Sequence, residues 1–148
     1  MKSTLVKFSN FIFPGIVFIG ISFVADAHAF DVIIRGLNVS ANKGVYRCLI
    51  FKGEDGFPGI PSNAVQSVNG TVANREGSCV FKGLTPGTYA VSTFHDANSN
   101  GKLDKNVLGI PKERYGFSRD ASRPFGPPRF DEASIDVKTD ETLIINLK

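Results

Sequence analysis

The stretch from His95 to Asp104 carries side chains whose types and spacing are those of an oxygen-ligand calcium loop. Acidic or amide residues alternate along it, and Gly101 stands at the sixth position, where such loops turn sharply. A hard cation takes roughly six to eight oxygen ligands, and alternate side chains can wrap it because the glycine lets the chain fold back. The candidate metal ligands are Asp96, Asn98, Asn100, the carbonyl of Lys102, Asp104 and, farther along the chain, Glu113.

This loop departs from the helix-loop-helix pattern at its twelfth position, where Val107 stands in place of a bidentate glutamate. Two asparagines also keep its charge low, so we expect calcium affinity on the order of 10⁻⁴ to 10⁻³ M. The alternative is an Asx-rich hairpin loop. In that interpretation Asn and Asp side chains accept hydrogen bonds from their own backbone, and Gly101 supplies a positive φ.

A second group of candidate residues lies in the long segment that follows, which is rich in Gly, Pro, Arg and aromatic residues. Guanidinium groups and ring faces in alternation can bind an anionic glycan, a peptide or an envelope protein. The alternative is that the aromatic side chains hold the segment on the domain while the arginines stay solvated. The candidate ligand-binding residues are Arg114, Tyr115, Phe117, Arg123 and Arg129.

The same region offers groups for a hydrolase acting on an envelope or extracellular glycan. A carboxylate pair from the acidic loop would serve glycoside hydrolysis, and Ser118 with His95 would supply a nucleophile and a base. Sequence alone does not place these groups together, and it shows no nucleophile-elbow motif or catalytic-metal cluster. We therefore expect a binding or accessory module and not an enzyme, with the hydrolase as the alternative.

The elements that must position these residues are short strands. Apolar and β-branched runs bounded by Gly, Asn, Asp and Pro recur along the chain, and no window shows a sustained helical stripe. This pattern predicts an all-β fold of two packed antiparallel sheets, with a helical turn near Ser62 to Val65. The seven predicted strands are Asp31 to Leu37, Val45 to Phe51, Val68 to Ala73, Ser78 to Lys82, Thr88 to His95, Ala133 to Lys138 and Leu143 to Leu147.

The N-terminus has the pattern of a cleavable signal peptide, residues 1–29. Lys2 and Lys7 form a positive region, an apolar stretch follows, and the small-residue site ends at Ala29. The alternative is an uncleaved membrane anchor, because the apolar run approaches the length of a span. Cleavage near Ala29 predicts a periplasmic or secreted protein whose mature chain, residues 30–148, is a single β-sandwich domain without a membrane span.

The mature chain has 15 basic and 13 acidic residues, and this near balance argues against nucleic-acid binding. Its only cysteines, Cys48 and Cys79, both lie in predicted strands. Export permits a disulfide between them, and two buried thiols are the alternative.

Two sets of residues resemble known families. Leu84-Thr85-Pro86-Gly87-Thr88-Tyr89 is similar to the turn that leads into a strand in transthyretin-like and carboxypeptidase-regulatory-like sandwiches. That resemblance implies a seven-stranded, immunoglobulin-like Greek-key sandwich with a loop-rich edge. The combined pattern from His95 to Asp104, Gly109 to Ser118 and Pro127 to Ala133 resembles a family of small exported bacterial proteins classed as a domain of unknown function. The family implies an exported sandwich and supplies no catalytic residue.

Overall fold

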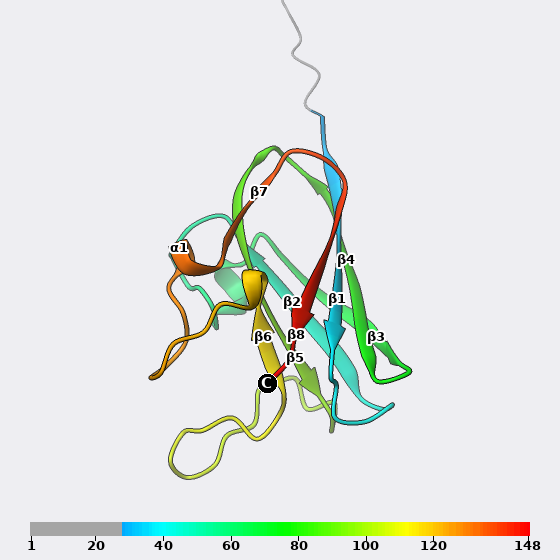
Figure 1. Ribbon diagram of the computed structural model, residues 1–148, viewed down its shortest axis with the longest axis vertical. Coiled ribbons are helices and arrows are strands. Elements are labelled where there is room, and N and C mark those ends of the chain that lie inside the picture. The colour runs from blue at the N-terminus through cyan, green and yellow to red at the C-terminus, as the bar shows by residue number, and fades with distance from the viewer. Residues whose placement is uncertain (1–27) are drawn as a thin grey trace, which may run out of the picture.

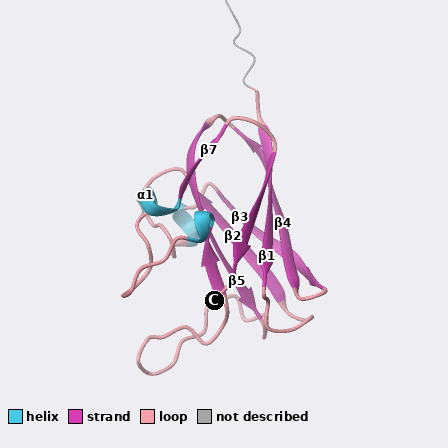
Figure 2. Cartoon of the chain, viewed as in Figure 1, coloured by secondary structure: helices cyan, strands magenta, loops and turns pink. Residues whose placement is uncertain are grey.

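The computed structural model describes residues 28–148 as eight strands and three short helical segments (Figures 1 and 2). Apart from its last two residues, the predicted signal peptide lies outside the described residues. The strands are β1 (Phe30–Leu37), β2 (Val45–Phe51), β3 (Gln66–Ala73), β4 (Glu76–Leu84), β5 (Gly87–Asp96), β6 (Tyr115–Phe117), β7 (Ser134–Val137) and β8 (Glu141–Asn146). The helical segments are η1 (Pro61–Asn63), η2 (Ser118–Asp120) and α1 (Phe130–Ala133).

The strands form one mixed sheet that is nearly closed into a barrel. Seven of them follow the order β6-β5-β2-β3-β4-β1-β8, and β7 pairs with β5 outside this path. Strand β3 joins its two halves, since Gln66 to Gly70 pair with β2 and Thr71 to Ala73 pair with β4. At the open side, the backbones of Tyr115 and Lys148 exchange two hydrogen bonds of 3.3 and 2.9 Å. The end of the chain therefore lies against β6.

The all-β prediction is confirmed, but the seven-stranded antiparallel Greek-key sandwich is not what the structure shows. Strands β1 and β8 pair in parallel, from Val32 with Glu141 to Leu37 with Asn146. Side chains alternate with the same period in parallel and antiparallel strands, so the sequence pattern carries no sign of strand direction. Strand β6 is the one described strand that the sequence pattern did not predict. It has only three residues, which is too short to show an alternation of apolar and polar side chains.

Two apolar clusters fill this fold, and every strand and both clusters lie within residues 30–148. The larger cluster lies on the inner face of the curved sheet, in the interior of the nearly closed barrel, and includes Ile34, Tyr46, Phe81 and Tyr89. The smaller one lies on the outer face of β5, where Ala90, Phe117 and Ala133 are buried and neighbouring rings pack against them. Strand β5 is buried on both faces for this reason, and its outer cluster supports the long loops.

Two glycines in neighbouring strands make room for Tyr46, one of the two buried core tyrosines. Gly36 of β1 and Gly77 of β4 are register partners, and a Cβ atom added to either would overlap the Tyr46 side chain. Glycine in a strand often marks such a close approach.

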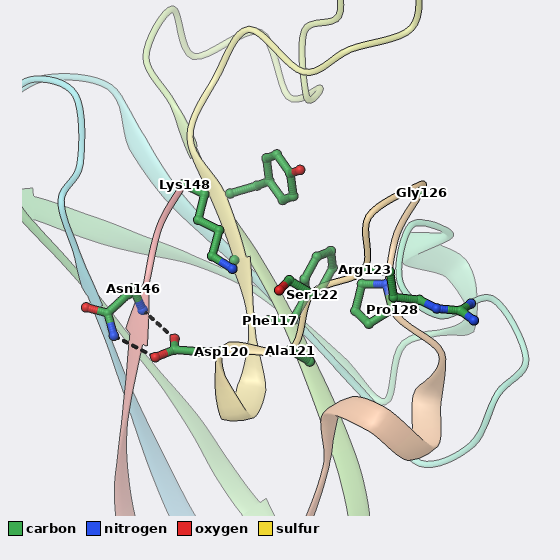
Figure 3. Close-up of a pocket in the computed structure, with 11 residues that line it drawn as sticks. Phe117, Asp120, Ala121, Ser122, Arg123, Gly126, Pro128, Asn146 and Lys148 are labelled. Atoms are coloured by element: carbon green, nitrogen blue, oxygen red, sulfur yellow. Dashed lines mark hydrogen bonds between the residues drawn. The ribbon is translucent and has the colours of Figure 1, made fainter.

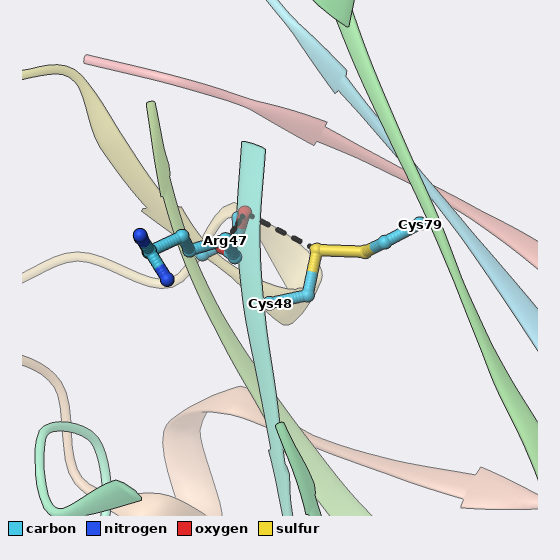
Figure 4. Close-up of a disulfide and its surroundings, with 4 residues drawn as sticks. Arg47, Cys48 and Cys79 are labelled. Atoms are coloured by element: carbon cyan, nitrogen blue, oxygen red, sulfur yellow. Dashed lines mark hydrogen bonds between the residues drawn. A yellow bond between two sulfur atoms is a disulfide. The ribbon is translucent and has the colours of Figure 1, made fainter. Parts of the chain in front are cut away.

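The predicted disulfide between Cys48 and Cys79 is confirmed (Figure 4). It crosses the core from β2 to β4, its Cα atoms are 6.7 Å apart, and both residues are buried. The sulfur of Cys48 also lies 3.6 Å from the hydroxyl of Thr93 on β5. The bridge therefore links two strands that are not hydrogen-bonded neighbours in the sheet.

Candidate functional site

The predicted calcium loop begins at the end of β5, where Asp96 has no exposed surface. Its Oδ2 accepts hydrogen bonds from Arg47 Nε at 2.6 Å and from the Gly101 amide at 2.8 Å, and its Oδ1 accepts one from the Asn100 amide at 3.0 Å. Burial alone would raise the pKa of this carboxyl, but these hydrogen bonds and the Arg47 charge together lower it. Asp96 is therefore an ionised anchor that folds the loop back on itself.

The other predicted ligands extend the same network. The side-chain amides of Asn98 and Asn100 donate to the Asp104 carboxylate at 2.8 to 3.1 Å. Their own Oδ1 atoms accept from the amides of Asn100 and Lys102. These bonds hold the two sides of the loop together across its width.

Glu113 closes the loop at its base. Its Oε1 accepts from the Ala97 amide at 2.9 Å, and its Oε2 accepts from the Asp104 amide at 3.0 Å. Sequence reasoning selected Glu113 only as the nearest downstream carboxylate, and the structure does bring it to the loop.

The predicted ligand side chains thus converge, yet their oxygens face hydrogen-bond donors of the chain itself. Each carboxylate of the set accepts at least two hydrogen bonds from the loop or from Arg47. These hydrogen bonds fix the positions of the loop oxygens in the structure. In residues 28–148, no three His, Cys, Asp or Glu residues form a group able to hold a metal ion. The hydrogen bonds are those expected of the Asx-rich hairpin loop, and calcium binding stays a prediction.

His95 and Ser118, two of the groups considered for hydrolysis, bond to different parts of the fold. His95 is buried, with Nδ1 2.8 Å from the Ser40 hydroxyl and Nε2 2.7 Å from the Lys43 carbonyl. It therefore fixes the loop between β1 and β2.

Ser118 lies at the gap between β6 and β7, which share one edge of β5. Its hydroxyl accepts from the Val91 amide at 2.9 Å and donates to the Ala133 carbonyl. A buried hydroxyl with both roles satisfied acts as a bridge between strands and is closed to solvent.

The candidate ligand-binding residues separate into buried and exposed groups. Tyr115 and Phe117 pack edge to face, with ring centroids 5.8 Å apart, and Phe117 belongs to the outer apolar cluster. Arg129 pairs with Asp131 at 3.1 Å, and Arg123 lies 3.5 Å from Glu132, so both flank α1. Arg114 is exposed.

A groove of about 1000 Å³ lies between the long loops, and sequence reasoning did not identify it. Phe94, Tyr115 and Phe117 line it together with residues of the 101–111 and 123–127 loops and of the 58–61 segment. Among its described lining residues, the charged side chains are Lys102, Lys105 and Arg123, and none is acidic. The apolar run Val107-Leu108-Gly109-Ile110-Pro111, inside an otherwise polar loop, was the available signal.

A much smaller pocket, of about 40 Å³, lies where the two ends of the sheet meet (Figure 3). Beside it, the Asp120 carboxylate accepts hydrogen bonds from the Asn146 amide at 2.8 Å and from its side chain at 2.6 Å. Asp120 and its neighbour Arg119 both have positive φ, of 52° and 61°. These contacts join η2 to β8.

The chain belongs to a bacterial protein family. The sequence model of DUF2141, described as an uncharacterized protein conserved in bacteria, matches residues 34–145, from within β1 to within β8. The predicted resemblance to a domain of unknown function is thereby confirmed. A search of curated proteins and a search of solved structures each found no match. In residues 28–148, no helix has the length and apolar character needed to cross a membrane.

Proposed function

We propose that this protein is an exported binding module that holds its ligand in the groove between the 97–114 and 121–129 loops. The observation that carries the proposal is the groove itself, whose described lining includes three aromatic rings on β5 and β6, three cationic side chains and no acidic residue. Ligand sites are concave and mostly apolar, with a few polar groups that set orientation. The disulfide supports export to the periplasm or beyond, after cleavage near Ala29, because such bonds persist in oxidising compartments.

The lining favours an extended anionic ligand, either an anionic glycan or a peptide segment of an envelope protein. Sugar rings and aliphatic side chains pack on aromatic faces such as Phe94 and Tyr115. Arg123 and the two lysines would pair with carboxylate or phosphate groups of the ligand.

Photo-crosslinking in the native bacterium tests this proposal. We expect benzoylphenylalanine at position 94, which lines the groove, to give discrete adducts of higher mass after irradiation. The same residue at Thr142, which is exposed on β8 and does not line the groove, is the control. Equal adduct yields from the two positions, or no adduct at position 94, would contradict groove binding.

Calcium stabilisation of the 96–104 loop is a second candidate property, and the spacing of Asp96, Asn98, Asn100 and Asp104 is the observation that favours it. An affinity of 10⁻⁴ to 10⁻³ M would make 10 mM calcium stabilise the protein by roughly 1 to 3 kcal/mol. Thermal unfolding in calcium and in chelator measures this directly. We expect a higher melting temperature in calcium than in chelator, and Asp104→Asn, which removes one ligand charge, is the control and should reduce that shift. Equal melting temperatures would contradict calcium binding.

We infer that the protein is not an enzyme. The carboxylates that a hydrolase would use, Asp96, Asp104 and Glu113, all accept hydrogen bonds within the loop. A glycosidase needs one carboxyl kept protonated and a second free to act as base or nucleophile. No observation on these residues favours that pair of roles.

A further inference from the structure

Two loops that border the groove carry exposed apolar side chains at their tips. Val107 and Leu108, in the loop between β5 and β6, are 102% and 79% exposed, and Phe125, in the loop between η2 and α1, is 93% exposed. Both loops lie on the same side of the sheet (Figure 1) and border the same groove. Isolated exposed apolar residues are common, but three projecting from adjacent loop tips indicate an interaction surface.

The first loop tip is held in one conformation. Lys105 pairs with Pro111 as an isolated β-bridge, and the Asn106 amide donates to the Ile110 carbonyl at 2.8 Å. The Asn106 side chain accepts from the amides of Leu108 and Ile110 at 2.9 and 3.0 Å. These bonds pair the backbone groups of the turn with one another and with the Asn106 side chain. The turn therefore has a defined conformation, in which Val107 and Leu108 are exposed to solvent.

Basic residues are frequent in the segment that carries these tips. Residues 97–129 contain seven basic and three acidic residues, whereas the rest of the mature chain has more acidic than basic residues. The three acidic groups, Asp104, Glu113 and Asp120, are engaged in the hydrogen bonds described above. In the part of the chain that the structure describes, Lys102, Lys105, Lys112 and Arg114 are exposed and form no ion pair; the ion pairs of this region belong to Arg123 and Arg129.

We propose that the 105–111 and 123–127 loop tips are a contact surface for an anionic lipid bilayer. Projecting apolar side chains suit the headgroup and acyl boundary of a flat membrane. The surrounding lysines and arginine would meet anionic headgroups, and each such residue near an anionic surface strengthens binding about five-fold. The membrane contact goes beyond the proposed function, because its occupant is a lipid surface; Lys105, Leu108 and Phe125 also line the groove, whereas Val107 does not.

Vesicle flotation of residues 30–148, which contain every strand and both apolar clusters, tests this inference. The probes are vesicles of phosphatidylcholine alone and vesicles with about a third phosphatidylglycerol. We expect binding to the anionic vesicles only, weakened when salt is raised from 0.1 to 0.5 M, since salt screens exposed charges. Val107→Asp with Leu108→Asp is expected to reduce this binding by at least about ten-fold, as is Phe125→Asp.

Ile144→Asp is the matched control, because Ile144 is an exposed apolar residue on β8, away from the loops. The variants Lys102→Glu and Lys105→Glu test the charge component against Lys138→Glu, which reverses an exposed lysine elsewhere. Equal binding to both vesicle types, no binding to either, or the same loss in the Ile144 control would overturn the proposal. Crosslinking at position 94 without vesicle binding would leave a protein or glycan partner in the groove and would also overturn it.

Discussion

Replacing both Cys48 and Cys79 by alanine is expected to lower the free energy of unfolding by roughly 3 to 4 kcal/mol. The two residues are 31 positions apart, so the bridge closes a loop that the unfolded chain would otherwise leave open. Both residues are also buried between β2 and β4, and their loss removes packing from the core. Urea unfolding followed by far-ultraviolet circular dichroism would measure the change.

Reduction of the unaltered protein separates the two contributions, because free thiols occupy nearly the same space as the bridge. We expect reductant to reproduce most of the loss in the native chain and to leave the double-alanine variant unchanged. If the reduced protein kept its full stability, the bridge would contribute little, and the packing of the sulfur atoms would explain the alanine result.

The second large effect is expected at Arg47, whose side chain pairs with the buried Asp96 carboxylate at the start of the 96–104 loop. Arg47→Ala would leave the Asp96 carboxylate buried with only the two backbone donors, and breaking such a pair costs about 3 kcal/mol or more. It would also remove the Arg47 hydrogen bond to the Asn69 side chain, at 2.8 Å. Urea unfolding measures the loss, and hydrogen exchange would locate it in the 96–104 loop.

Arg35→Ala is the matched control for this experiment. Arg35 pairs with Glu76 on the surface, where the two side chains are 48% and 42% exposed, and such pairs contribute under about 1 kcal/mol. Equal losses from the two arginine variants would mean that the Asp96 pair behaves as a surface interaction.

The same pair makes stability depend on pH in a predictable direction. The pKa of Asp96 is lowered from its ordinary value of 3.8, so the folded state keeps this carboxyl ionised at a pH where the unfolded state begins to protonate it. Its contribution is therefore fully present well above pH 3.8 and is lost as pH falls through the folded pKa. Asp96→Asn should remove that component of acid unfolding, and a variant that unfolded with the native acid profile would contradict this assignment.

Much of the fold followed from local sequence pattern. The predicted strand Val45–Phe51 has the observed bounds, and the other six predicted strands overlap observed ones, with ends that differ by a few residues. Alternation and turn residues locate a strand because they act within a few residues of chain. The direction of β8, the short strand β6 and the near closure of the sheet depend on pairing between distant segments, which local pattern does not contain.

In the 96–104 loop and the groove, too, some features follow from local sequence and others from tertiary structure. The sequence alone determined that Asp96, Asn98, Asn100 and Asp104 would share one loop, because their alternation and Gly101 make the chain turn back within ten residues. Only the tertiary structure decided what those oxygens face, since Arg47 comes from β2 and fills the position beside Asp96. It also decided that the 97–114 and 121–129 loops border one groove, because β6 and η2 fix both against β5 by contacts that span distant parts of the chain.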